Sequence, residues 1–170
     1  PMLELTFLIP GGRVTVFGVH LRSRLETGSE DIRRGQLEHL KALIAEHDDS
    51  FVIVAGDFNL DPRRPDEPMS EYPDALSAGT VIPVSADPGR VGIGVMYSPL
   101  LDQDIALSPP GTYFYDDAWH IYDSIIMGND AIDGNALEFE SIGIVSSFSL
   151  LDPLSRPLRF DPSTGRGFSD

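Results

Sequence analysis

Residues 51–59 read Phe-Val-Ile-Val-Ala-Gly-Asp-Phe-Asn, an apolar run of strand length that ends at a glycine. The run is followed by an acid, Asp57, and an amide, Asn59. In an extended backbone, positions i and i+2 point to the same side, so we expect both side chains to project together from the end of a buried strand. A carboxylate that accepts a proton from water, beside an amide that donates to a phosphoryl oxygen, is half of a hydrolytic site.

The same residues also suit a simple turn at the end of a strand. Asp and Asn are common at such turns, because their side chains bond the local backbone and tolerate unusual dihedral angles. Spacing alone therefore favours neither interpretation of Asp57 and Asn59, and the other motifs in the chain have to decide between them.

Length and composition indicate a folded domain. The chain has 170 residues, of which 41% are hydrophobic, and it has no repeat, low-complexity tract or long linker. We therefore expect residues 1–170 to form a single domain with a packed core. No apolar run is long enough to span a bilayer, so the sequence predicts no membrane span.

The charge balance limits the partners that the sequence predicts. The formal net charge is -15, so a broad basic surface for nucleic acid is not expected. Clustered carboxylates can instead attract divalent cations, which neutralise phosphate locally, although most of the 27 acids are expected simply to be solvated. The chain has no cysteine, which excludes disulfides and thiolate metal sites and leaves the compartment open.

Hydrophobic patterning predicts several strands and one long helix. Pro10-Gly11-Gly12 is typical of a hairpin turn between strands at 3–9 and 13–20, and the second strand is apolar on both faces. Residues 30–46 are expected to be helical, capped by Thr27 or Ser29, and this helix leads into the strand at 51–55. Its apolar stripe comprises Leu37, Leu40, Leu43 and Ile44.

The second half of the chain is less regular. Long loops are expected at 61–89, with one short helix near 70–78, and a strand is expected at 91–97. A second hairpin is expected, with strands at 112–115 and 119–127 joined across Asp116-Asp117. A further strand is expected at 141–148, followed by a surface loop at 152–167. Many strands with few helices favour a sandwich with its helices on the outside.

Five short motifs follow one another along the chain. They are Val-His-Leu-Arg-Ser-Arg at 19–24, Arg-Arg-Gly-Gln at 33–36, Gly-Asp-Phe-Asn at 56–59, Trp-His-Ile-Tyr-Asp-Ser-Ile-Ile at 119–126 and Gly-Phe-Ser-Asp at 167–170. This ordered set resembles the endonuclease/exonuclease/phosphatase (DNase I-like) superfamily, and it is most similar to the superfamily's uncharacterised bacterial members. The resemblance covers nearly all of the chain.

The resemblance implies a fold, a chemistry and a set of roles. The fold would be an α/β (α+β) four-layer sandwich of two mainly antiparallel sheets flanked by helices, and the chemistry would be phosphate ester hydrolysis with Mg²⁺ or Mn²⁺. Asp57 would orient or deprotonate water, and Asn59 would hydrogen-bond phosphoryl oxygens. His20 would contact the scissile phosphate or protonate the leaving group. Asp123 would hold a catalytic histidine, and Asp170 would lie beside the metal.

Local sequence context bears on Asp123 and on the other polar and aromatic residues. Asp123 lies between Ile121 and Ile125, and an acid in such a strand needs a partner if it is buried. Arg22 and Arg24 can touch phosphate, although an arginine near a strand end is more often a solvated charge. The remaining histidines, His39, His47 and His120, are interpreted as structural or surface residues. Tyr113 and Trp119 are interpreted as packing residues rather than a base-stacking platform.

The chain also departs from the family pattern. The family supplies an early asparagine, a metal-binding glutamate and a closing histidine, and none of these has a counterpart here, so we expect a partial domain that is incomplete at both ends. The leading interpretation is a metal-dependent phosphodiesterase, most of all a nuclease. The alternatives are a phosphatase or a phospholipid or inositol phosphodiesterase, and an inactive, non-catalytic sandwich module. We expect a phosphate-ester substrate, with nucleic acid as one candidate and no protein partner, and impaired activity for residues 1–170 alone.

Overall fold

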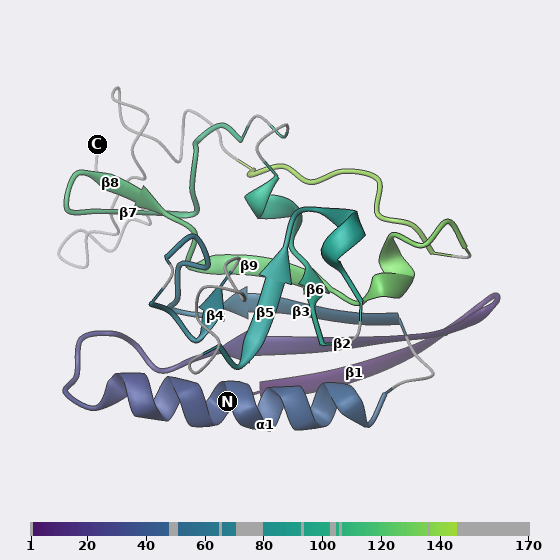
Figure 1. Cartoon of the computed structure of the whole chain (residues 1–170), viewed down its shortest axis with the longest axis horizontal. Helices are drawn as coiled ribbons and strands as arrows, with labels where there is room; N and C mark the ends of the chain where they lie inside the picture. Colours follow the sequence, from purple (N-terminus) through teal and green to yellow (C-terminus); the bar gives the residue numbers. More distant parts are fainter. Residues whose placement is uncertain are drawn as a thin grey trace, which may run out of the picture.

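A computed structural model describes residues 2–47, 51–64, 66–70, 80–92, 94–102, 105, 107–135 and 137–145 (Figure 1). Within these ranges there are two sheets and one helix longer than a single turn. The helix is α1 (Ser29–Ala45), and 3₁₀ turns lie at Pro88–Arg90, Pro99–Leu101 and Asn129–Ala131. The strands are β1 (Met2–Ile9), β2 (Gly12–His20), β3 (Phe51–Asp57), β4 (Met69–Ser70), β5 (Ile82–Ser85), β6 (Met96–Tyr97), β7 (Tyr113–Tyr115), β8 (Ala118–His120) and β9 (Asp123–Met127).

The larger sheet is mixed. Its seven strands are ordered β1-β2-β3-β9-β6-β5-β4, and the second sheet is the β7–β8 hairpin. β2 pairs with β1 antiparallel and with β3 parallel, and β9 runs antiparallel to β3. The predicted α/β class with two sheets is therefore confirmed.

The parallel pair of β2 and β3 depends on α1. Two parallel strands cannot be joined by a tight turn, and here α1 makes the crossover between them. The predicted hairpin between β1 and β2 is confirmed, with Ile9 facing Gly12 at its turn. Because β2 pairs with a strand on each side, it lies inside the sheet.

The start of α1 differs from the expected cap. The residue before the helix is Gly28, which has a φ of +76° and no side chain, and no side-chain hydrogen bond caps the helix. The side chain of Thr27 or Ser29 was expected to cap the helix. Instead Ser29 lies in the first turn, where its Oγ accepts a hydrogen bond from Nη1 of Arg33 at 3.1 Å. The left-handed turn at Gly28 thus takes the place of a side-chain cap.

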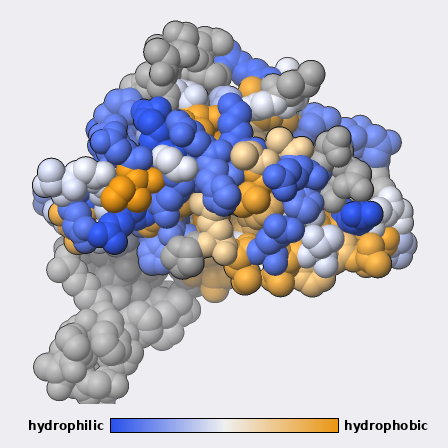
Figure 2. All heavy atoms as spheres, turned by 90° about the horizontal axis from the view of Figure 1, so that it is seen from below, coloured by the Kyte–Doolittle hydropathy of each residue, from blue (hydrophilic) through white to orange (hydrophobic). Residues whose placement is uncertain are grey.

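The core lies between α1 and one face of the large sheet. Phe17, Val54, Leu37 and Leu40 are fully buried there. Burying one such side chain contributes about 1.5–3 kcal/mol. The pleat sends alternate residues to the other face, where Leu3 and Phe7 of β1 are 61% and 52% exposed. Figure 2 shows hydrophobic surface along the lower right border of the molecule, on the side where the β1–β2 hairpin ends.

The second half of the chain departs from several expectations. The strand expected at 119–127 is two strands: β8 pairs with β7, whereas β9 joins the large sheet beside β3. The chain splits here because each half has its own backbone partner, and the bend between them brings Tyr122 O to the N–H of Phe58 at 2.8 Å. The turn itself is as expected, since Asp116 and Asp117 both have positive φ values, 51° and 56°.

Five further expectations are corrected or fall outside the described residues. The loop predicted at 61–89 contains the short strands β4 and β5, and the strand predicted at 91–97 is only β6. Residues 141–145 form no strand, which corrects the first part of the strand predicted at 141–148. Residues 71–79 and 146–170 are not described, so most of the predicted helix near 70–78 and the loop at 152–167 lie outside the structure.

Candidate functional site

Three predicted site residues lie in one row across the large sheet. His20 is the last residue of β2 and Asp57 the last residue of β3, and they face each other in the parallel register. Asp123 is the first residue of the antiparallel strand β9 and faces Asp57 from the other side. In Figure 1, β2 and β3 end and β9 begins on the left of the sheet, beside the β7–β8 hairpin. The strand directions alone therefore bring these three residues to one edge.

His20 and Asp57 form the most direct side-chain pair in this row. The distance from Nε2 of His20 to Oδ2 of Asp57 is 3.7 Å. Their side chains are 68% and 36% exposed, so both are open to solvent and to a substrate. An ion pair forms between them when the imidazole is protonated. The arrangement places a group that can donate a proton next to a group that can accept one.

Asp57 and Asn59 do not continue as an extended strand. Asn59 has a φ of +51°, and its N–H donates to Oδ1 of Asp57 at 2.8 Å, so the chain turns here. Nδ2 of Asn59 donates to the carbonyl of Leu21 at 3.1 Å, which fastens the end of β3 to the end of β2. The expectation that both side chains project from one strand face is therefore corrected. A local Asx turn replaces the extended backbone, because the aspartate accepts from the amide two residues on.

The turn leaves part of each polar group available. Oδ1 of Asp57 is bonded to Asn59, whereas Oδ2 faces His20. An amide NH₂ has two hydrogens, and the bond to Leu21 uses one of those on Asn59. A carboxylate oxygen and an amide hydrogen thus remain for a substrate or a water molecule.

Asp123 is at the surface rather than enclosed in its strand. The residue is exposed, but surrounding atoms shield its carboxylate in part. This desolvation, together with the negative charge of Asp57, raises the pKa of Asp123 above its ordinary value. Its backbone N–H donates to Oγ1 of Thr112 at 3.0 Å, which ties the first residue of β9 to the hairpin.

The two arginines proposed for phosphate both have acidic partners. The guanidinium of Arg22 pairs with Glu26, and both side chains are exposed. Nη1 of Arg24 pairs with Oε1 of Glu67 at 2.5 Å, and the Glu67 side chain is only 6% exposed. Arg24 also lies over the ring of Tyr122, 5.5 Å from its centroid. A phosphate would therefore have to compete with an existing carboxylate at either position.

A buried ionic cluster beside the row was not predicted from the sequence. Asp61 is 3% exposed and accepts from Nε and Nη2 of Arg63, at 2.9 and 2.7 Å. Burial alone would raise the pKa of Asp61, but the hydrogen bonds and positive charge of Arg63 outweigh it and lower the pKa below the ordinary value. Nδ1 of His120 lies 3.5 Å from Oδ2 of Asp61. The sequence does contain a signal for the ion pair. An acid and an arginine two residues apart can pair, and Asp61-Pro62-Arg63 follows soon after the turn at Asn59.

The donors near Asp57 fit a divalent cation only in part. Asp57 and Asp123 are paired across β3 and β9, near enough for the charge of Asp57 to act on Asp123, and carboxylate oxygens suit Mg²⁺ or Mn²⁺. The part of the chain that the structure describes contains no group of three or more acids or histidines that could hold a metal ion. A complete metal site would need further ligands, and Asp170, the predicted one, lies outside the described residues.

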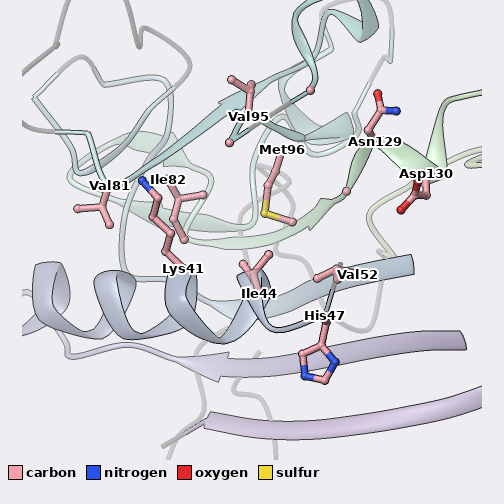
Figure 3. Close-up of a pocket in the computed structure, with 13 residues that line it drawn as sticks. Lys41, Ile44, His47, Val52, Val81, Ile82, Val95, Met96, Asn129 and Asp130 are labelled. Atoms are coloured by element: carbon pink, nitrogen blue, oxygen red, sulfur yellow. The ribbon is translucent and has the colours of Figure 1, made fainter. Parts of the chain in front are cut away.

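A separate cavity lies at the other end of the strands. It has a volume of about 190 Å³ and is lined by Lys41 of α1, Val52 of β3, Ile82 of β5 and Gly128 after β9, among others (Figure 3). Val52 is near the start of β3 and Gly128 follows the end of β9, whereas Asp57 and Asp123 lie at the opposite ends of these strands. The cavity is thus not part of the row. No helix within the described residues is long and apolar enough to cross a membrane.

Comparison with known proteins gives structural likeness only. No protein-family model and no curated protein sequence matches the chain. Among solved structures, humanized TDP2 from D. rerio matches with 20% identity and a TM-score of 0.46 over 75% of this chain and 44% of that one. A mutant of beta toxin from Staphylococcus aureus with bound magnesium ions matches with 15% identity and a TM-score of 0.45, over 86% and 47%. Sphingomyelinase C from Streptomyces griseocarneus matches with 20% identity and a TM-score of 0.40, over 74% and 41%.

The chain spans less than half the length of each of these three structures. At identities of 20% or less and TM-scores below 0.5, the likeness establishes no reaction, substrate or cofactor for this chain.

Proposed function

We propose that this chain is part of a phosphodiesterase that depends on a divalent metal. The leading candidate is a nuclease, whose substrate is nucleic acid. The observation that carries the proposal is the row of His20, Asp57 and Asp123 at one edge of the sheet, with Asn59 directly after it. A base, an acid and an amide donor next to one another are the groups that hydrolysis of a phosphate ester requires.

The reaction adds water across one ester bond. The water oxygen forms a bond to phosphorus while Oδ2 of Asp57 accepts its proton, and the ester P–O bond to the leaving oxygen breaks. Protonated His20 donates a proton to that oxygen, so the products are an alcohol and a phosphomonoester. The free amide hydrogen of Asn59 donates to the phosphoryl oxygen as charge develops on it. A bound Mg²⁺ or Mn²⁺, held by Asp123 with further ligands, would neutralise charge on the phosphate.

A small phosphate ester is the second candidate substrate. The net charge of -15 gives nucleic acid no overall attraction, and a phospholipid, sugar phosphate or inositol phosphate would use the same groups. The third candidate is an inactive sandwich module. It does not explain why His20 and Asp57 lie side by side.

Metal dependence tests the proposal. In a longer protein with sequence restored on both sides, hydrolysis of bis(p-nitrophenyl) phosphate should require Mg²⁺ or Mn²⁺, and residues 1–170 alone should turn over slowly or not at all. Parallel assays with an oligonucleotide and a phospholipid rank the substrates. Hydrolysis that survives exhaustive chelation would overturn the metal-dependent mechanism.

A further inference from the structure

The β7–β8 hairpin has two different aromatic faces. On one face, Phe114 and Trp119 pack edge to face, with ring centroids 5.3 Å apart, and both are half-buried. On the other face, Tyr113 and Tyr115 are 45% and 56% exposed. The rings of the first face are therefore partly covered, whereas the second face presents its rings to solvent.

The exposed face continues as a row of four rings. Tyr115 stacks on Tyr113 with centroids 6.4 Å apart, and Tyr113 stacks on Tyr122 at 5.3 Å. Tyr122 in turn stacks on His120 at 5.0 Å, and all three interplanar angles lie between 22° and 25°. These separations are typical of offset-stacked aromatic pairs. We call Tyr115, Tyr113, Tyr122 and His120 the aromatic row.

The aromatic row is fastened to the candidate site at its inner end. Tyr122 immediately precedes Asp123, and its carbonyl accepts the N–H of Phe58, which lies between Asp57 and Asn59. Thr112, which precedes Tyr113, accepts the N–H of Asp123. At the outer end, Tyr115 precedes the turn and has the most exposed ring of the row. A molecule bound on the tyrosines is therefore held at a fixed place relative to Asp57 and Asp123.

We propose that the aromatic row is a stacking platform for the bases of a single-stranded nucleic acid, with Tyr113 and Tyr115 as the contact residues. The inference rests on the proposed function, because it names the substrate class of that site. Stacking of a base on an aromatic ring contributes about 1–3 kcal/mol separately from any contact to phosphate, so it supplies affinity for a nucleic acid that the net charge of -15 does not. The bases would lie along the row while the scissile phosphate reaches the acids.

The charges around the hairpin favour a base over a lipid surface. Asp116 and Asp117 form the turn at the tip, next to Tyr115, and both are exposed. Two carboxylates at the leading end repel an anionic membrane that the tip would have to approach. They also repel the phosphates of a nucleic acid, which can point away from the tip while the bases contact the rings. At the inner end of the row, Arg24 lies over Tyr122 and is paired with Glu67. A strand with its bases on the tyrosines and its phosphates turned from the tip suits this arrangement.

Equilibrium binding tests the proposal without relying on hydrolysis. The probe is a short fluorescent DNA strand, compared with an abasic strand of equal length and charge, measured by anisotropy with the 170-residue chain in Mg²⁺. Wild type should prefer the strand with bases. Tyr115→Ala and Tyr113→Ala should each weaken that binding by roughly 5- to 100-fold and leave binding of the abasic strand unchanged. Tyr115→Phe, which keeps the ring, should bind as wild type does.

The remaining outcomes also decide the matter. Equal binding of the two strands by wild type overturns the proposal, and this comparison holds even if an alanine variant fails to fold. Binding of zwitterionic lipid vesicles that both alanine variants lose, with no effect on DNA, assigns the row to a membrane instead. Base-dependent binding without hydrolysis in the longer protein supports the platform and removes the phosphodiesterase. Hydrolysis in the longer protein together with equal binding of the two strands supports the phosphodiesterase and overturns the platform.

Discussion

Asp57 is a turn residue and a candidate base at the same time. Its Oδ1 holds the turn through the N–H of Asn59, and its Oδ2 faces His20. The two interpretations that the sequence left open are thus compatible, because a carboxylate has two oxygens. Position in the sequence was enough to predict that His20 and Asp57 end strands. It was not enough to predict the left-handed Asn59, because a side-chain bond to the local backbone replaced the extended conformation.

The carboxyl group of Asp123 should make the stability of the folded protein depend on pH. Its pKa is raised in the folded protein, so the folded chain binds more protons than the unfolded chain between the ordinary pKa of 3.8 and the raised one. Stability therefore falls as pH rises through this window. Asp123→Asn removes the carboxylate and should be more stable than wild type at neutral pH, with an advantage that shrinks toward pH 4. Urea titrations at several pH values measure this.

The control for Asp123→Asn is Glu140→Gln, which removes one negative charge at an exposed position outside the strands. An equal gain in both variants would mean that net charge, and not the neighbourhood of Asp57, is responsible.

At the scale of the elements, Gly56 lets β2 and β3 pair where the site begins. Its φ is +144°, and a Cβ added there would lie 2.0 Å from the carbonyl oxygen of Val19. Gly56→Ala should therefore destabilise the protein by about 3 kcal/mol or more, since both a backbone clash and a strained dihedral result. Thermal and urea unfolding, followed by circular dichroism, provide the measurement.

Gly35 is the matched control for that substitution. It lies inside α1, and an added Cβ there meets nothing within 4 Å. Gly35→Ala should stabilise the protein by about 0.8–1 kcal/mol, because alanine is the better helix former. If both alanine variants shift stability in the same direction, the account of the β2–β3 pairing is wrong.

Elements with local patterns were predictable, and elements that depend on distant partners were not. β1, β2, α1 and β3 were predicted, because each has a clear apolar pattern and clear ends. The split between β8 and β9 was not, since residues 119–127 contain no turn signal and only the pairing with β3 decides where β9 begins. The Asp61–His120 contact joins residues that are far apart in sequence, so no local pattern reveals it.

At the scale of the whole molecule, one sheet face stands out. Leu3, Leu5 and Phe7 of β1 are 61%, 46% and 52% exposed, and β1 is the edge strand of the large sheet. An exposed apolar face beside an open edge favours association between chains. The 170-residue chain should therefore self-associate, and Leu5→Lys should shift it toward the monomer in analytical ultracentrifugation.

The control for Leu5→Lys is Leu25→Lys. Leu25 is 91% exposed but lies in the loop before α1 and not on β1. If wild type is a monodisperse monomer, or if the lysine at position 25 has the same effect, the face of β1 does not cause association.

The central claim is that the edge formed by His20, Asp57 and Asp123 hydrolyses phosphate esters. Asp57→Asn tests it most directly, because the amide oxygen can still accept the N–H of Asn59 and hold the turn while the base is lost. Turnover of bis(p-nitrophenyl) phosphate is measured in the longer protein beside the melting temperature. The account predicts an unchanged melting temperature and a turnover lower by about a hundredfold or more. Unchanged turnover in a folded Asp57→Asn protein would contradict it and leave residues 56–59 as a turn alone.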